Sequence, residues 1–137
     1  MCRIRLFDCR GLQSGLRARR RGTGDTRLRL REMIVLTHVM REQLEAGSLS
    51  DFGRLLNVGW QLKQNLAGGI RDNFIDHCWA VGMQNGAEGG KLLGAGGGGF
   101  MLFFAEPDAQ ERIKRALPDL RALPVQFDWN GVVCRMR

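Results

Sequence analysis

A glycine-rich segment followed at once by an apolar strand limits the folds open to this chain more than any other feature. Residues 89–99 read Gly-Gly-Lys-Leu-Leu-Gly-Ala-Gly-Gly-Gly-Gly, and residues 100–105 read Phe-Met-Leu-Phe-Phe-Ala. The second run has the length and composition of a buried strand. Because each glycine loses more backbone entropy on ordering than any other residue, the glycine run indicates that another group comes close to the backbone. A flexible turn between two strands is the alternative.

The order of elements excludes two nucleotide-binding motifs that the glycines resemble. Gly94, Gly96 and Gly99 match the letters G-x-G-x-x-G, but the dinucleotide fold needs a helix after them and a strand follows instead. The phosphate-binding loop of nucleoside triphosphatases requires Ser or Thr after Gly-Lys, whereas Leu92 follows Lys91. The segment can still turn its backbone N–H groups into a concave nest for an anion.

Three amphipathic helices are predicted before this segment. Apolar residues repeat at three- and four-residue intervals over residues 26–47, 50–69 and 72–86, and each of these stretches ends at glycine. Gly59 and Gly82 lie inside two of the helices, where a glycine costs about 1 kcal/mol relative to alanine. We therefore expect close packing of the helices at these two positions.

A short helix and a hairpin are predicted after the apolar strand. Pro107 opens the helix, which extends to Leu117. Apolar and polar residues alternate over residues 125–129, which indicates a half-buried strand. Asn130-Gly131 is typical of a hairpin turn and precedes a returning strand predicted at residues 132–134. Segregated helices and mainly antiparallel strands predict an α+β two-layer fold, and a chain of 137 residues has room for one domain.

The excess of positive over negative charge is confined to the start of the chain. Residues 1–31 carry ten arginines and two acids, whereas the rest carries eleven basic and twelve acidic side chains. A domain that binds nucleic acid should be basic on its folded faces, so neither nucleic acid nor a membrane is expected as a partner. Residues 1–24 are predicted to be a basic, disordered leader before a domain over residues 25–137. A translated stretch upstream of a truncated reading frame explains this leader better than an organelle transit peptide, because serine is scarce.

Cysteine usage indicates a reducing compartment and no metal site. The four cysteines show no metal-ligand spacing, and no apolar run of signal-peptide length follows the N-terminal charges; they are Cys2, Cys9, Cys78 and Cys134. Reduced thiols in a cytoplasmic protein are therefore expected. The longest apolar run, at residues 100–105, is far shorter than the roughly 20 residues that span a bilayer.

The sequence from Gly86 to Phe100 resembles the third, C-terminal motif of the GHMP kinases. The similarity extends through Asp51–Leu56, Trp60–Lys63 and Met101–Phe104, so it covers about residues 26–134. Within the family it is most similar to the branch that phosphorylates heptose 7-phosphate, and less similar to galactokinase-like and fucokinase-like members. The resemblance implies a ferredoxin-like C-terminal domain, with helices packed on a small, mainly antiparallel sheet.

The resemblance also implies an activity and a missing lobe. It implies phosphoryl transfer from ATP to a hydroxyl of a sugar or heptose phosphate, with Mg²⁺, in a cleft between two lobes. In the family the phosphate-binding loop and the catalytic acid belong to the N-terminal lobe, and neither motif occurs in this sequence. No catalytic residue or tight ATP binding is therefore expected in this chain, which would be inactive alone. Its contribution would be a phosphate-proximal loop comprising Gly89, Gly90, Lys91, Gly94, Ala95, Gly96, Gly97, Gly98 and Gly99.

Few other residues are candidates for chemistry. Asp51 is expected to serve the dipole of its helix, and neither His38 nor His77 has a partner visible in the sequence. Only the resemblance suggests that Lys63 and Asn65 approach a sugar.

An alternative function is a non-catalytic binding module, or a subunit that pairs with a separately encoded N-terminal lobe. A half-enzyme would expose apolar surface for such a partner. The tryptophans in the helical stripes, Trp60 and Trp79, are interpreted first as core residues.

Overall fold

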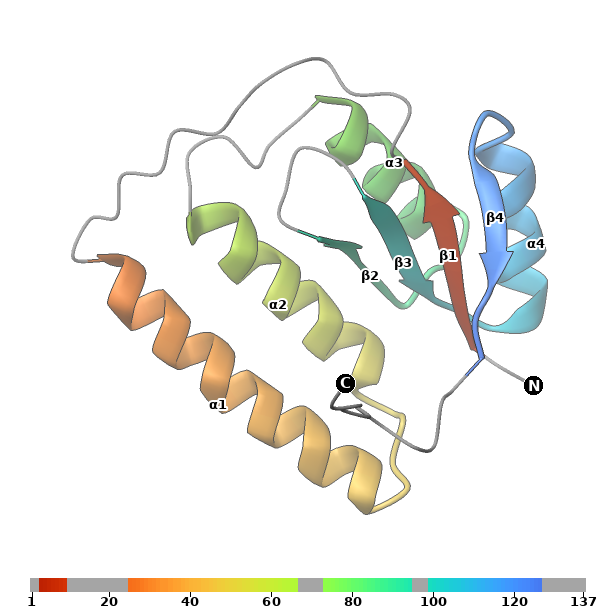
Figure 1. The fold of residues 1–137 in the computed structure, drawn as a ribbon. Helices are drawn as coiled ribbons and strands as arrows, with labels where there is room; N and C mark the ends of the chain where they lie inside the picture. Colours follow the sequence, from red (N-terminus) through yellow and green to blue (C-terminus); the bar gives the residue numbers. More distant parts are fainter. Residues whose placement is uncertain (1–2, 10–24, 67–72, 95–98, 127–137) are drawn as a thin grey trace, which may run out of the picture.

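The computed structural model describes residues 3–9, 25–66, 73–94 and 99–126, which form four strands and four helices (Figure 1). The strands are β1 Ile4–Asp8, β2 Gly89–Leu93, β3 Phe100–Phe104 and β4 Arg121–Pro124. The helices are α1 Asp25–Glu45, α2 Phe52–Leu66, α3 Asn73–Gln84 and α4 Pro107–Ala116.

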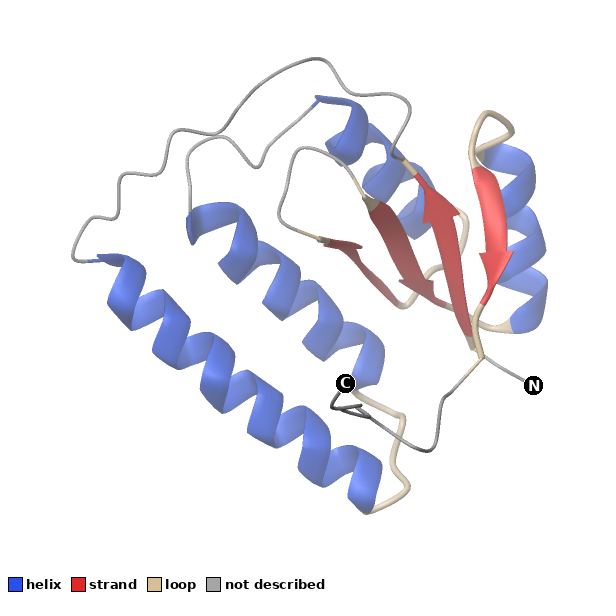
Figure 2. Cartoon of the chain, viewed as in Figure 1, coloured by secondary structure: helices blue, strands red, loops and turns tan. Residues whose placement is uncertain are grey.

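The strands form one antiparallel sheet in the order β2-β3-β1-β4 (Figure 2). β2 and β3 form a hairpin, and α4 connects β3 to β4 across β1. Helices α3 and α4 lie on one face of the sheet, and α2 packs along β2 (Figure 1). This is the split β-α-β arrangement of ferredoxin-like domains, with α1 and α2 added before α3. The predicted α+β fold, with helices on a small antiparallel sheet, is confirmed.

The prediction of a disordered leader is wrong for Ile4–Asp8, because these residues form β1, which occupies an inner position of the sheet. Phe7 is fully buried opposite Met101 of β3. This strand was not predicted, because five residues are too few to show a clear alternation of apolar and polar side chains, and arginines flank and interrupt them. Residues 10–24 lie outside the described residues, so the leader remains a prediction there.

Arg3, just before β1, contacts acidic and aromatic side chains next to the sheet. Its guanidinium lies 4.4 Å from the centre of the Phe104 ring, and it forms ion pairs with Glu88 and, at 3.0 Å, with Glu106. A guanidinium can stack on an aromatic ring and pair with carboxylates at the same time. Part of the positive charge is therefore neutralised within the fold.

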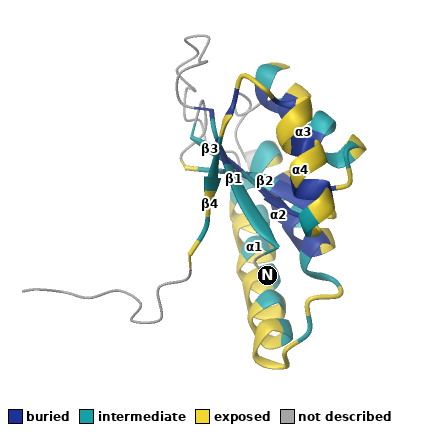
Figure 3. Ribbon diagram, turned by 90° about the vertical axis from the view of Figure 1, so that its right-hand side faces the viewer, coloured by how far each residue is buried: buried dark blue, intermediate teal, exposed yellow. Residues whose placement is uncertain are grey.

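The core lies between the sheet and the helices that cover it (Figure 3). Phe7 and Phe103 meet edge to face, with ring centroids 5.7 Å apart and planes at 74°. Trp60 of α2 is 1% exposed, which confirms its interpretation as a core residue. Further fully buried large side chains on β2, β3 and α4 are Leu92, Met101, Phe104 and Ile113.

Helix α1 packs against α2 but leaves much of its apolar surface exposed (Figure 3). Met33, Leu36 and Met40 are half-buried, whereas Ile34 and Val35 are 58% and 61% exposed. The apolar face of α1 is therefore wider than the part of it that α2 covers. None of the described helices combines the length and the apolar character needed to cross a membrane.

The C-terminal hairpin predicted from residue 125 falls largely outside the described residues. The structure instead places a short edge strand, β4, at Arg121–Pro124, and Val125 and Gln126 follow it without strand structure. The sequence concealed β4 because it has four residues, begins with a charge and ends in proline, which is tolerated at a sheet edge. Residues 127–137 are not described, so the Asn130-Gly131 turn remains a prediction.

Candidate functional site

The glycine-rich segment forms the β2–β3 hairpin. Leu93 pairs with Phe100, and the connection between them runs from Gly94 to Gly99. Gly94 and Gly99 have φ angles of 101° and 143°, which L side chains rarely adopt, so glycine is required at both ends of the loop. The strand predicted after the glycines is confirmed, which rules out the dinucleotide-binding arrangement. Residues 95–98, which include the predicted site residues Ala95, Gly96, Gly97 and Gly98, lie outside the described residues.

Polar side chains from α2 and α3 bind the outer edge of β2. Asn57 accepts a hydrogen bond from the Gly90 amide at 2.9 Å, and the Trp79 indole N–H donates to the Gly90 carbonyl at 3.2 Å. Lys63 Nζ donates to the carbonyls of Leu92 at 3.0 Å and Gly94 at 2.6 Å. A free sheet edge normally exposes a row of unpaired backbone groups. Here Asn57, Lys63 and Trp79, which we call the edge clamp, pair four of these groups: the Gly90 amide and the carbonyls of Gly90, Leu92 and Gly94.

The paired glycines at the start of β2 allow this close approach. A methyl group on Gly89 would overlap the carbonyl group of Gly53 in α2, and one on Gly90 would lie 2.7 Å from the Phe103 ring. Both glycines are buried. Gly89 and Gly90 were predicted as phosphate-proximal residues, which stays a prediction. In the structure Gly89 allows β2 to approach α2, and Gly90 leaves room for the Phe103 ring of β3.

Two lysines give the loop a positive environment. Burial, and secondly the charge of Lys91, lower the pKa of Lys63 below its ordinary value. The Lys91 ammonium group therefore lies close enough to Lys63 for the two charges to repel each other. Among the described residues, no ion pair joins either lysine to a carboxylate. Positive charge without a paired acid favours a bound anion.

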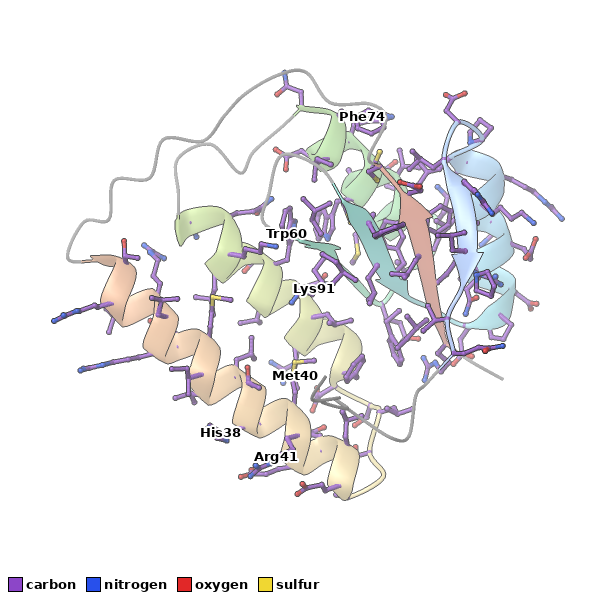
Figure 4. The ribbon with its side chains drawn as sticks, viewed as in Figure 1. His38, Met40, Arg41, Trp60, Phe74 and Lys91 are labelled. Carbon is purple, nitrogen blue, oxygen red and sulfur yellow. The ribbon has the colours of Figure 1, made fainter. Side chains whose placement is uncertain are left out.

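The other candidates do not contribute to this site. Asp51 lies just before α2, where its carbonyl accepts from Leu55 N–H and its carboxylate pairs with Arg54 at 3.1 Å. His38 and His77 are exposed on α1 and α3, and His38 lies on the outer side of its helix (Figure 4). Asn65, at the end of α2, is also exposed. In the described part of the chain, no three His, Cys, Asp or Glu side chains gather as a metal site would require.

Sequence reasoning missed two members of the edge clamp. Trp79 was interpreted as core, and it does pack against the core while its indole N–H serves the hairpin. Asn57 carried no signal, because a side chain that bonds a strand 33 residues away leaves no local pattern. An asparagine on the buried side of an amphipathic helix is the clue that could have found it, because a buried amide needs partners.

Comparison with known proteins identifies the family. The family model of the C-terminal domain of GHMP kinases matches residues 40–121, which is more than half of the chain. The chain belongs to the GHMP kinase family through this C-terminal domain.

Two curated relatives act on sugars, according to their names. The D-glycero-alpha-D-manno-heptose 7-phosphate kinase of Campylobacter jejuni is 30% identical over 78 residues, which are 57% of this chain and 23% of that protein. The L-fucokinase/L-fucose-1-P guanylyltransferase of Bacteroides fragilis is 32% identical over 81 residues, covering 58% of this chain and 8% of that protein. The chain thus spans less than a quarter of either relative.

Two solved mevalonate kinases share the fold. The Staphylococcus aureus enzyme superposes with a TM-score of 0.64 at 19% identity, covering 90% of this chain and 42% of that one. The L. major enzyme, solved with R-mevalonate, gives a TM-score of 0.60 at 20% identity, covering 85% and 38% of the two chains. At this level of identity the similarity concerns the fold alone.

The edge clamp leads to a prediction for Lys63. Lys63→Met should lower the free energy of unfolding by about 1–2 kcal/mol, because the carbonyls of Leu92 and Gly94 lose their donor. Amide hydrogen exchange should also quicken in β2. Lys63→Arg, which keeps the charge and the donors, should lose less. Urea unfolding measures the stability of all three chains, and a Lys63→Met chain as stable as the unchanged one would show that the lysine does not hold the hairpin.

Proposed function

We propose that this chain is the C-terminal lobe of an ATP-dependent kinase that phosphorylates a hydroxyl of a sugar or heptose phosphate. The observation that carries the proposal is the clamped glycine hairpin, which contains Lys91 and is bonded by Lys63, two lysines that no carboxylate pairs with among the described residues. The names of the two curated relatives, a heptose 7-phosphate kinase and a fucokinase, support a sugar as the acceptor.

In this proposal the hairpin is one wall of a cleft. Phosphoryl transfer depends mainly on positioning and on neutralising the charge of the transferred group. Backbone N–H groups between Gly94 and Gly99 would donate to phosphate oxygens, and Lys91 would add a point charge beside them. The edge clamp would hold the loop in place, so that it need not reorganise when the substrate binds.

The ATP-binding half of the site would come from a second lobe. Mg²⁺ prefers carboxylate and other oxygen ligands, and the described residues include no cluster of three acidic, His or Cys side chains. The phosphate-binding loop, the catalytic acid and the metal ligands are assigned to the N-terminal lobe of the complete kinase.

A phosphoryl-transfer assay tests whether the chain suffices. The purified chain, incubated with ATP, Mg²⁺ and heptose 7-phosphate, should form no heptose bisphosphate, because the proposal assigns ATP binding to a second lobe. The intact Campylobacter jejuni kinase is the positive control in the same assay. Efficient turnover by the isolated chain would contradict the assignment of catalysis to another lobe.

A second candidate function is a non-catalytic subunit that pairs with a separately encoded N-terminal lobe. It is favoured by an open apolar groove of about 510 Å³ between α1 and α2, lined by Val35, Leu36, Val39, Leu55, Val58 and Leu62. Exposed apolar surfaces of this kind often mark an interface. Size-exclusion chromatography with a separately produced N-terminal lobe should give a heterodimer. Val35→Glu and Val39→Glu should abolish it, and a complex unaffected by these charges would exclude the groove.

A further inference from the structure

Helix α1 carries an exposed apolar stripe on the flank that faces away from the groove between α1 and α2. Leu30, Ile34 and Leu44 are 47%, 58% and 50% exposed. Thr37 and Arg41 lie on the same line, at alternating steps of four and three residues, so the five side chains share one face of the helix. We call these five residues the outer stripe.

The outer stripe is separate from the two surfaces of α1 described above. Met33, Leu36 and Met40 are half-buried on the side that packs against α2, and Met40 points towards α2 in Figure 4. Val35 and Val39 line the groove. Because successive residues turn by about 100° around a helix, the groove and the outer stripe lie on opposite flanks of the contact with α2. A partner that covers the outer stripe therefore leaves the groove free.

The middle of the outer stripe is a threonine whose hydroxyl already has a partner. Thr37 Oγ1 donates to the Met33 carbonyl at 2.8 Å, one turn earlier in the same helix. This bond lies within α1, so it would persist if another surface covered the threonine. Arg41 pairs with Glu45 at 3.5 Å, and its aliphatic stem adds apolar surface to the stripe. The stripe can therefore be covered while the Thr37 hydroxyl keeps its acceptor.

The charges beside the outer stripe are sorted along the helix. Arg27 and Arg31 are exposed towards the start of α1, and Glu42 and Glu45 are exposed towards its end. A second α1 lying antiparallel to the first would bring the arginines of each copy beside the glutamates of the other. A parallel helix would instead place like charges together. Exposed ion pairs add little affinity, but complementary charges select the partner and its direction.

We propose that the outer stripes of two copies of this chain pack against each other as an antiparallel helix pair with two-fold symmetry. In such an interface both copies use the same patch. Leu30 and Leu44 are each seven residues from Thr37, so a two-fold axis at Thr37 brings Leu30 of one copy to Leu44 of the second. Each copy would contribute one helix face, which is a small interface, so the dimer is expected to dissociate on dilution. This inference does not depend on the proposed kinase function, because dimerisation is measured without any substrate.

Light scattering coupled to size-exclusion chromatography gives the mass of the full chain over a range of concentrations. We expect the mass to rise with concentration from one chain to two. Ile34→Glu should raise the dissociation constant at least about tenfold, because the interface would bury its charge. Val35→Glu is the matched control, since Val35 is 61% exposed on the same helix but lines the groove, so its dimer should persist. Circular dichroism checks that both variants stay folded.

Cysteine cross-linking tests the direction of the two helices. In a background with Cys2→Ser and Cys134→Ser, Thr37→Cys should link two copies after mild oxidation, because a residue on the axis meets itself. Leu30→Cys alone should not link, because its two copies would lie about 21 Å apart along the helix pair. Leu30→Cys combined with Leu44→Cys should link again.

Three results would overturn the proposal. The first is a single-chain mass at concentrations up to about 1 mM, where even a weak dimer forms. The second is a dimer that Val35→Glu dissociates and Ile34→Glu does not, which would place the groove in the interface. The third is cross-linking by Leu30→Cys alone, which would show that the two helices run parallel.

Discussion

Replacement of Gly89 by alanine is expected to destabilise the chain by about 3 kcal/mol, at the upper end of the usual cost of overpacking. The added methyl group would overlap the backbone carbonyl of Gly53, and a backbone cannot rotate away as a flexible side chain can. Helix α2 would have to move off β2, which would strain the bonds from Asn57 and Lys63 to the hairpin. Urea unfolding gives the loss of stability, and hydrogen exchange in β2 gives the loss of the clamp.

A second glycine substitution tests whether the effect arises at this contact. A methyl group on Gly53 would lie 2.7 Å from the backbone of Glu88, so Gly53→Ala should also destabilise the chain. The double variant should lose less than the sum of the two, because α2 has already moved after the first substitution. Additive losses, or a Gly89→Ala chain of unchanged stability, would show that the helix and strand are not in direct backbone contact.

Gly82→Ala is expected to cost about 1–3 kcal/mol, because the methyl group would enter the space of the Phe103 ring. Phe103 is fully buried and packs against Phe7, so the ring has little room to turn. Thermal unfolding should show the loss as a drop of about 3–4 °C in Tm for each kcal/mol in a chain of this size.

Gly59→Ala is the matched control, since Gly59 also lies inside a helix. Its new methyl group would meet only the end of the Leu36 side chain, at 3.2 Å, which can shift by rotation. Alanine favours a helix by about 1 kcal/mol over glycine, so this variant should be as stable as the unchanged chain or more so. Equal losses at Gly59 and Gly82 would contradict the packing described here.

The sequence predicted the elements that have a strong local pattern. The three long helices, the strand at Phe100–Phe104 and the helix opened by Pro107 all lie within a few residues of their predicted places. Strand β1 was missed because its apolar residues are few and lie among arginines, although Phe7 is fully buried. Its role depends on pairing with β3, almost 100 residues away, and such a pairing has no local signal.

The candidate site was predictable only in part. The glycine run and the strand after it were sufficient to exclude two nucleotide-binding motifs and to point to the hairpin. The clamp was not predictable, because Asn57 and Trp79 act through bonds to the backbone of β2 that only the packed fold creates. The two glycines expected to make close contacts also differ: Gly82 faces a fully buried ring, whereas Gly59 faces the flexible end of Leu36.

An NMR titration tests most directly whether the glycine hairpin is the phosphate-facing wall of a kinase cleft. The ¹⁵N-labelled chain is titrated with heptose 7-phosphate, and with the unphosphorylated heptose as the control for the sugar alone. We expect amide shifts concentrated between Lys91 and Gly99 with the phosphorylated sugar, weaker shifts with the neutral sugar, and a reduced response in Lys91→Gln. Shifts confined to other parts of the fold, or equal responses to the two sugars, would contradict the account.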